Sequence, residues 1–478
     1  MGWLDSPLGL FVMFALALGI RVVVAPKFGF YGDLNYFRKW VTDLHDVGIR
    51  HFYASVGDTT YIYPPGYLYV LDVLAHVSSS PSYLLVKFPT ILGDLALAWT
   101  AGVLAQRLAP AALRSRIPVR ALVVAAVLFN PAVIALSVVW GQVDAIPAFL
   151  VLASLLLLVT GRPTARREVA AMILFAAAFA MKPQSGFIFP VLGYALYRRH
   201  LHRRNVSDVV RGVARIVAVG APALVLLAVS GLPFGLSPVA LKDFYSKASN
   251  GYKITSVWAF NLWGVIGFQR GDVRNAGTVV QFVAGVPAFD VGALAFVAGT
   301  AYVIWRAHRS INRGHDEGLV LVASAAMTSL LAFTLLTRMH ERYLFPVLAC
   351  LAPLVVWRGF RWIYVAVSTL FVLNMWYPFA VYNGQWKYYN PTWKLTTFYY
   401  QPVFRWVFGN IAATDTWQKK MWSLFMVVAC VVLVGRGFRW IERRDDALVP
   451  TVDAVAPEPV PPEPFAGTPA GTDVLEPT

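Results

Sequence analysis

The sequence predicts an all-α, polytopic membrane protein with about twelve transmembrane helices. Of its 478 residues, 58% are hydrophobic and only 14% are charged, whereas a soluble domain is about half apolar and a quarter charged. Apolar runs close to the length of about 20 residues that crosses a bilayer recur along most of the chain. The net charge of +16 is therefore explained by Lys and Arg in short cytoplasmic loops, and it does not indicate nucleic-acid binding.

The apolar runs define the predicted transmembrane segments in chain order. The segment 63–77 is also apolar, but it is short, begins with Pro64 and Pro65, and is rich in Tyr. Apolar segments of that length are more often interfacial or re-entrant than spanning, so we expect this one to lie at the membrane surface. The predicted spans are 7–25, 84–106, 119–138, 144–160, 168–182, 186–198, 210–230, 288–306, 318–337, 342–357, 361–379 and 418–435.

Basic residues between the spans predict the topology of a multi-pass protein of the plasma membrane. Positively charged loops are retained in the cytoplasm. Counting from these loops places both termini in the cytoplasm and the segments 26–83 and 231–287 outside. Residues 1–444 then form the membrane domain, and the Pro- and acid-rich residues 445–478 form a disordered cytoplasmic tail. The basic clusters lie within 107–120, 162–167, 198–211, 306–313, 358–361 and 436–444.

Asp33 lies a few residues after the first predicted span, where an amphipathic pattern begins. One interpretation is a helix N-cap, because Asp readily accepts hydrogen bonds from backbone N–H groups at a helix start. The other is a general base, which needs a carboxylate at an interface that a substrate hydroxyl can reach. Position alone favours the cap, but the polar residues expected on the same side of the membrane favour the base.

Three polar interruptions at the ends of predicted spans should face the same side as Asp33. Irregular backbone at membrane depth persists only inside protein or beside a water-filled cavity. Cations at such sites suit an anionic ligand such as a lipid phosphate, although snorkelling and headgroup anchoring are alternatives. For the two residues of the first interruption, the alternative is a capped helix start. The interruptions are 139–144 with Gln142 and Asp144, 181–185 with Lys182, and 337–343 with Arg338, His340 and Arg342.

Two further ionisable residues, Lys87 and Asp94, lie on one face of the predicted span 84–106. Charged residues inside spans are functional candidates by default, but we favour a structural pair between helices here. The sequence contains no Cys or His cluster with metal-ligand spacing, no P-loop and no Rossmann fingerprint. The segment 231–287 contains the motif 261–264 and is expected to form a short interfacial helix.

In its local motifs the chain resembles the GT-C superfamily of membrane glycosyltransferases, which use polyprenyl-phosphate sugars at the outer or lumenal face. The run His340–Arg342 is similar to the His-Glu-Lys motif of glucosyltransferases that extend dolichol-linked oligosaccharides. The resemblance covers roughly residues 7–345. It depends on the order of several short motifs and on their expected position on one side of the membrane. These motifs are YPPGYLYVL (63–71), WGQVDA (140–145), MKPQ (181–184), NLWG (261–264) and TRMHERYLFP (337–346).

The resemblance implies that Asp33 is the catalytic base. Members often have an acidic pair in this loop, but here Leu34 and Asn35 follow Asp33, and only Asp58 is considered as a second acid. The residues that the resemblance and the interruptions assign to the donor phosphate or the substrate are Lys182, Arg338, His340, Arg342, Gln142, Asp144 and Asn261.

The expected activity is inverting transfer of a hexose or pentose from a polyprenyl-phosphate donor to a lipid, glycan or protein acceptor on the outer face. The bacterial members it resembles are mannosyl- or glucosyltransferases of the cell envelope. This scheme requires neither a metal nor a cofactor. The alternatives are a transporter or flippase, or a polymerase, of lipid-linked glycans. Transporters usually show repeated halves and broken helices near the bilayer midplane, whereas the polar interruptions here gather near one face.

Overall fold

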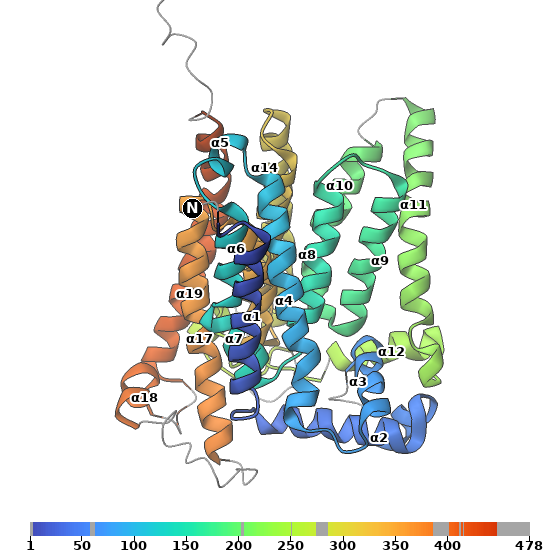
Figure 1. Cartoon of the computed structure of the whole chain (residues 1–478), viewed down its shortest axis with the longest axis vertical. Coiled ribbons are helices and arrows are strands. Elements are labelled where there is room, and N and C mark those ends of the chain that lie inside the picture. The colour runs from blue at the N-terminus through green and yellow to red at the C-terminus, as the bar shows by residue number, and fades with distance from the viewer. Residues whose placement is uncertain are drawn as a thin grey trace, which may run out of the picture.

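The computed structural model of the chain describes residues 3–57, 63–201, 205–249, 251–273, 285–385, 401–410, 413 and 415–446. Roughly parallel helices form a bundle, and further helices lie across one of its ends (Figure 1). The bundle helices are α1 (Pro7–Val24), α4 (Tyr83–Leu108), α6 (Val119–Leu128), α7 (Pro131–Ile134), the π-helix η1 (Ala135–Trp140), α8 (Ala145–Val159), α9 (Ala165–Met181), α10 (Phe189–Leu201), α11 (Val206–Val229), α14 (Ala288–Asn312), α15 (Glu317–Leu335), α16 (Phe345–Leu351), α17 (Arg358–Gln385) and α19 (Trp417–Asp446).

Within the described residues, seven helices are long and apolar enough to cross a membrane: α1, α4, α11, α14, α15, α17 and α19. The segments Val119–Leu128 and Pro131–Trp140, bent by 41°, would together make an eighth. The remaining predicted spans correspond to shorter helices, namely α8, α9, α10 and α16. The chain is thus an all-α polytopic membrane protein, and the count of twelve spans stays a prediction.

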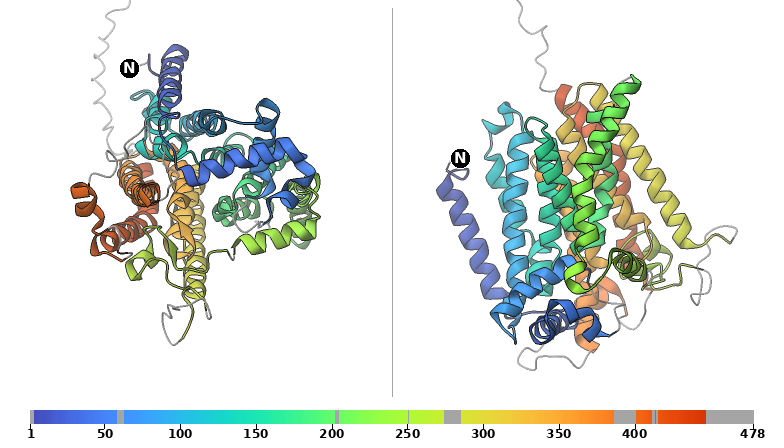
Figure 2. Two further views of the ribbon diagram at one scale, coloured as in Figure 1. Left: turned by 90° about the horizontal axis from the view of Figure 1, so that it is seen from below. Right: turned by 90° about the vertical axis from the view of Figure 1, so that its right-hand side faces the viewer.

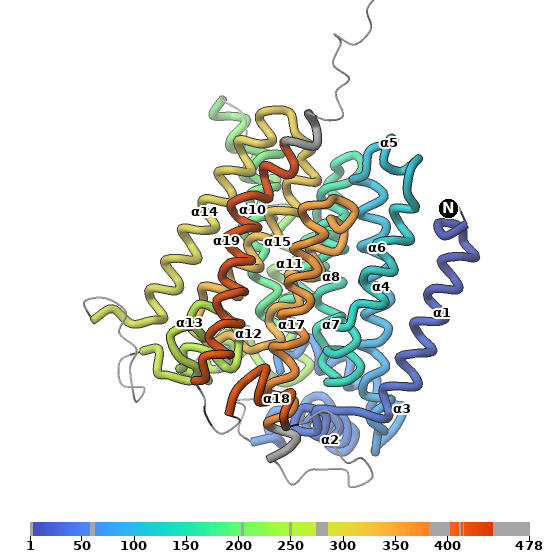
Figure 3. Tube along the Cα trace, turned by 90° about the vertical axis from the view of Figure 1, so that its left-hand side faces the viewer, coloured from blue at the N-terminus to red at the C-terminus, as the bar shows by residue number. Residues whose placement is uncertain are grey.

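The centre of the bundle is α15, whose apolar residues are buried on all sides. A helix that is hydrophobic all round is stable only when other helices surround it. Helices α14, α16 and α19 pack against α15, and Figure 3 shows α14, α15 and α19 running side by side. Near one side of the bundle, Arg21 of α1 and Asp94 of α4 form a fully buried ion pair at 2.8 Å. Asp94 therefore pairs with the first helix and not with Lys87.

The helices across the end of the bundle are α2 (Tyr31–Val56), α3 (Pro65–Val77) and α12 (Pro238–Ser249), as Figures 1 and 2 show. Helix α2 buries Leu34, Phe37, Val41 and Leu44, which recur at helical spacing, and it packs against α3. Helix α5 (Ala111–Arg114) lies at the opposite end of the bundle. The predicted surface segment 63–77 is thus a helix that lies beside α2.

A second group of short elements lies at the same end as α2 and comes from the later part of the chain. Strand β1 (Ser256–Val257) pairs in parallel with β2 (Met339–His340). The short helices of this group and of the breaks between bundle helices are α13 (Leu262–Ile266), α18 (Gln401–Phe408), η2 (Pro183–Ile188), η3 (Leu232–Phe234), η4 (Glu341–Leu344) and η5 (Ala352–Leu354). Asp58 and residues 447–478, which include most of the predicted tail, lie outside the described residues.

Local sequence explains the breaks that bring polar residues to this end. Pro183 disfavours helical backbone at the residue before it, and Lys182 is accordingly extended, with φ −147° and ψ 117°. The π-helix η1 ends at Gly141, whose φ of +93° is left-handed and favours glycine. Helix α15 ends before Arg338, a non-glycine residue with φ +64°. At each break a helix ends, and the residues of a predicted polar interruption adopt non-helical backbone there.

Candidate functional site

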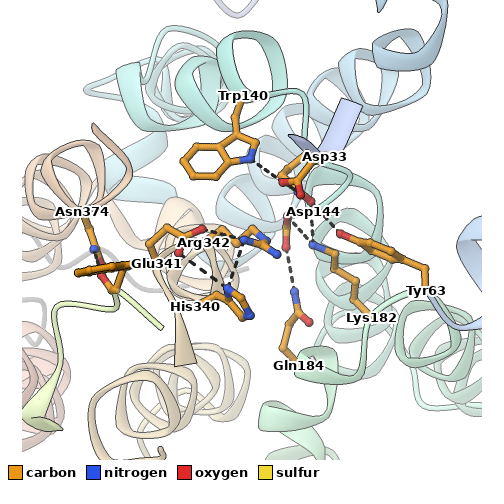
Figure 4. Close-up of polar contacts among 12 residues, drawn as sticks. Asp33, Tyr63, Trp140, Asp144, Lys182, Gln184, His340, Glu341, Arg342 and Asn374 are labelled. Atoms are coloured by element: carbon orange, nitrogen blue, oxygen red, sulfur yellow. Dashed lines mark hydrogen bonds and ion pairs between the residues drawn. The ribbon is translucent and has the colours of Figure 1, made fainter. Parts of the chain in front are cut away.

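Asp33 lies in the first turn of α2, but Phe30 occupies the N-cap position of that helix. The Asp33 Oδ2 atom instead accepts hydrogen bonds from the indole Nε1–H of Trp140, at 2.8 Å, and from the side-chain amide of Gln142. Figure 4 shows these contacts. The Asp33 side chain is therefore directed away from its own helix and toward the end of η1.

The segment that precedes Asp33 is fastened to the same place. The backbone N–H of Phe30 donates to the carbonyl of Trp140 at 3.1 Å, and the two aromatic rings stack with their centroids 4.3 Å apart. Both the backbone and the side chains thus hold the start of α2 against the end of η1. Asp33 itself remains half-buried, so the residue is not completely enclosed by the protein.

Gln142 is fully buried, and its neighbours fix the orientation of its amide. Its Oε1 accepts from the Tyr63 hydroxyl at 2.9 Å and from Lys182 Nζ at 3.2 Å, so the NH₂ group must face Asp33. An indole N–H and an amide NH₂ can only donate. Asp33 Oδ2 is therefore the acceptor of two hydrogen bonds.

Lys182 is almost completely buried, and it forms an ion pair with Asp144 at 2.8 Å. The other oxygen of the Asp144 carboxylate accepts from Gln184 Nε2 at 2.9 Å. A buried charge requires such partners, because its desolvation is otherwise uncompensated. The first and second predicted interruptions therefore meet in one hydrogen-bonded group that ends at Asp33.

The third interruption contributes His340, Glu341 and Arg342. Arg342 Nη1 donates to Glu341 Oε1 at 2.7 Å and contacts His340 Nδ1 at 3.4 Å. Since guanidinium is only a donor, His340 Nδ1 accepts, and this contact assigns the ring proton to Nε2. Burial, with the charges of Arg342 and Lys182, lowers the pKa of His340 well below its usual value, so the ring is neutral. Burial raises the pKa of Glu341, and Arg342 opposes that effect.

One donor in this cluster has no partner. The Nε–H of Arg342 is buried and makes no hydrogen bond to any described residue. Figure 4 shows the guanidinium between Glu341 and the group formed by Asp33, Asp144 and Lys182. An unsatisfied buried donor costs about 1–3 kcal/mol, and such a donor in a polar cluster is typical of a site that receives a ligand.

Arg338 and Asn261 lie apart from this cluster among the described contacts. Arg338 Nε donates to Asp272 Oδ2 at 2.7 Å, and Thr337 donates to the same oxygen at 2.9 Å. Asn261 caps α13 by accepting from the backbone N–H groups of Trp263 and Gly264. The structure therefore gives both residues partners that hold the local fold, and it brings Gln142, Asp144, Lys182, His340 and Arg342 together with Asp33.

Four residues of the cluster were not chosen as sites from the sequence: Trp140, Tyr63, Gln184 and Glu341. All four lie inside the short motifs that carried the resemblance. Tyr63 was expected in a segment at the membrane surface and Trp140 in a polar interruption, although buried Trp and Tyr usually donate a hydrogen bond. The tendency of buried Trp and Tyr to donate a hydrogen bond was the available signal.

A model of glycosyltransferase family 87 matches residues 61–336, which is more than half of the chain. A comparison with curated proteins gives no match. The matched range contains Gln142, Asp144 and Lys182, whereas Asp33 and Arg342 lie beside it in sequence. Family 87 consists of membrane glycosyltransferases of the GT-C type, which confirms the superfamily and the enzyme class predicted from the motifs. The chain therefore belongs to glycosyltransferase family 87 and is a multi-pass membrane glycosyltransferase.

Proposed function

We propose that this glycosyltransferase moves a sugar from a polyprenyl phosphate to a lipid, glycan or protein acceptor, with inversion at the anomeric carbon. The observation that carries the proposal is the buried cluster at one end of the bundle. It combines a half-buried carboxylate, Asp33, with a buried cation, Lys182, and a largely buried one, Arg342. A carboxylate suits deprotonation of an acceptor, and fixed cations suit a leaving phosphate.

In this mechanism Asp33 takes the proton of the acceptor hydroxyl while the hydroxyl oxygen attacks the anomeric carbon. Among the described residues, both hydrogen bonds to the Asp33 carboxylate end on Oδ2. These donors stabilise the ionised carboxylate and fix its plane, so that Oδ1 is the oxygen that receives the proton. The new C–O bond forms as the bond from the anomeric carbon to the phosphate oxygen breaks, which inverts the anomeric configuration.

The electron pair of the broken bond leaves with the lipid phosphate, which carries an additional negative charge. Preorganised donors aimed at a developing anion are worth far more in a buried site than in water. Arg342 supplies its unpaired Nε–H, and the neutral His340 offers Nε2–H. The positive charge of Lys182 lies close enough to affect the pKa of His340, which supports a role for Lys182 in binding the same phosphate.

We propose that the Asp33 cluster faces the outer side of the membrane. In Figure 1 the helices α2, α3 and α12 lie at the end of the bundle opposite to α5. The predicted cytoplasmic basic cluster 107–120 surrounds α5. By the positive-inside rule, the Asp33 cluster then faces the outside of the plasma membrane, with both termini in the cytoplasm. Nucleotide sugars are absent from that side, so a lipid-linked donor fits.

The donor is tested by incubating the purified protein with a panel of polyprenyl-phosphate monosaccharides and membrane lipid acceptors, and by following the product by mass spectrometry. We expect transfer from at least one member of the panel, and no transfer from nucleotide sugars. Transfer from nucleotide sugars alone would contradict the proposal. Movement of intact lipid-linked glycan across liposomes, with no sugar transferred, would instead support the transporter.

The orientation is tested by cysteine labelling in a background that lacks Cys350 and Cys430. Ser55 on α2 and Ser246 on α12 are exposed at the end that carries Asp33, whereas Ser115 is exposed at the end of α5. In intact cells, we expect Ser55→Cys and Ser246→Cys to react with a membrane-impermeant maleimide. Ser115→Cys should react only after the membrane is permeabilised. The reverse pattern would place the Asp33 cluster in the cytoplasm.

A further inference from the structure

Lys87 lies inside the membrane-spanning helix α4 and is completely buried. Its ammonium group donates to three backbone carbonyls: those of Ala25 and Val138, each at 2.8 Å, and that of Phe28. A lysine ammonium has three N–H donors, so all of them are used. Among the described residues, no carboxylate forms an ion pair with Lys87. Asp94, on the same helix, instead pairs with Arg21 and accepts a hydrogen bond from Ser137.

Two helix ends converge on this cation. Ala25 is the C-cap of α1, and Val138 lies in the last turn of η1. The last carbonyls of a helix lack intrahelical partners and carry the negative end of its dipole. A lysine between two such ends satisfies carbonyls of both. The price is burial of a charge in the membrane, which apolar packing of similar volume would avoid.

The two segments that Lys87 joins are those that carry the proposed base and its hydrogen-bond donors. After Ala25 and Phe28 the chain continues directly into α2 and Asp33. After Val138 it continues to Trp140 and Gln142, both of which donate to Asp33. We propose that Lys87 is a positioning residue for Asp33, because it clamps the end of α1 to the end of η1. This inference rests on the proposed function of Asp33.

The side chains beside this clamp pack closely against Gly141. A Cβ atom on Gly141 would lie 2.6 Å from Leu34 Cδ2 and 2.9 Å from Lys87 Cε. Leu34 follows Asp33 directly in α2. Gly141 therefore lies against the side chain of Lys87 and against a side chain at the start of α2. A side chain at Gly141 must therefore shift the side chain of Lys87, that of Leu34, or both, and it must also adopt a left-handed φ of +93°.

Lys87→Met tests the clamp, because it keeps most of the apolar stem and removes the three donors. We expect kcat to fall about tenfold to a hundredfold, since a misplacement of about 1 Å can cost about a hundredfold. The donor KM should change little, because the proposed phosphate ligands lie at the N-cap of η2 (Lys182), in β2 (His340) and in η4 (Arg342), and not on the clamped segments. Lys87→Arg keeps donors and should recover part of the lost kcat.

Arg167→Met is the matched control. Arg167 also donates to backbone carbonyls, those of Leu157 and Thr160, but it does so between α8 and α9 at the opposite end of the bundle. We expect this variant to unfold at a lower temperature in detergent and to keep the wild-type kcat. An equal loss of kcat in both variants would overturn the proposal, because general destabilisation would then explain the effect.

The following outcomes decide whether Lys87 positions Asp33. A folded Lys87→Met protein with wild-type kcat would overturn the positioning role. If Lys87→Met does not fold, Lys87→Gln replaces it, since this variant keeps a polar amide in place of the ammonium group and leaves Trp140 and Gln142 unchanged. A lower kcat with unchanged donor KM supports the proposal, and wild-type kcat refutes it. Sugar transfer by the wild-type protein in the same assay tests the proposed function. A wild-type protein that transfers no sugar contradicts that function, whereas the variants test only the role of Lys87.

Discussion

Asp33→Asn is expected to reduce sugar transfer by on the order of a hundredfold to ten-thousandfold, the typical cost of losing a general base. The amide has almost the same shape as the carboxylate, but it cannot accept the acceptor proton. Both described donors to Asp33, Trp140 and Gln142, end on the same oxygen. An Asn side chain can present its carbonyl oxygen at that position, so the fold and the donor site should persist.

The measurement compares kcat, donor KM and thermal unfolding between the variant and the wild type. Asp43→Asn is the matched control, because Asp43 lies on the same helix and pairs with Lys39 at 2.6 Å. We expect the control to transfer sugar at the wild-type rate. Asp33→Ala removes both the proton acceptor and the acceptor of the two hydrogen bonds, so it is less informative. An Asp33→Asn variant with near-normal turnover would remove Asp33 from the mechanism and reopen the transporter alternative.

The sequence was sufficient to predict the membrane fold class and the core of the Asp33 cluster, for a physical reason. Apolar runs identify the spans, and Lys and Arg in the short loops identify the cytoplasmic side. Both can be recognised from neighbouring residues in the sequence, so the side of each loop follows from counting spans along the chain. Gln142, Lys182 and Arg342 lie at breaks between helices, and the count placed those breaks on one side. Their proximity to Asp33 then followed from the small cross-section of a bundle.

The partners of individual side chains could not be predicted in the same way, because they depend on packing between distant segments. Arg338 was expected near the phosphate, and its ion-pair partner in the structure is Asp272, which lies 66 residues away in sequence. Lys87 was expected in a pair between helices, yet backbone carbonyls satisfy it. A charge in a span predicts that a partner exists, and it does not predict which group the partner is.

Arg342→Met is expected to lower kcat by about a hundredfold to a thousandfold, the typical cost of removing one preorganised donor from an anion-stabilising site. The guanidinium has an unused donor, since its Nε–H is buried without a partner among the described residues. Arg342→Lys keeps the charge but loses the planar fork that binds phosphate in a bidentate manner. We therefore expect its kcat to lie between those of wild type and Arg342→Met.

A loss of activity in Arg342→Met has a competing explanation, because the substitution also strands Glu341. That carboxylate is buried and bonded to Arg342 at 2.7 Å, and removing one partner of a buried pair typically costs about 3–5 kcal/mol. The double variant Arg342→Met/Glu341→Gln removes both charges and separates the explanations. If the folded double variant stays as slow as Arg342→Met, the guanidinium itself stabilises the leaving phosphate. If it regains the wild-type kcat, the loss came from the stranded carboxylate, and the phosphate must be bound by Lys182 and His340 without Arg342.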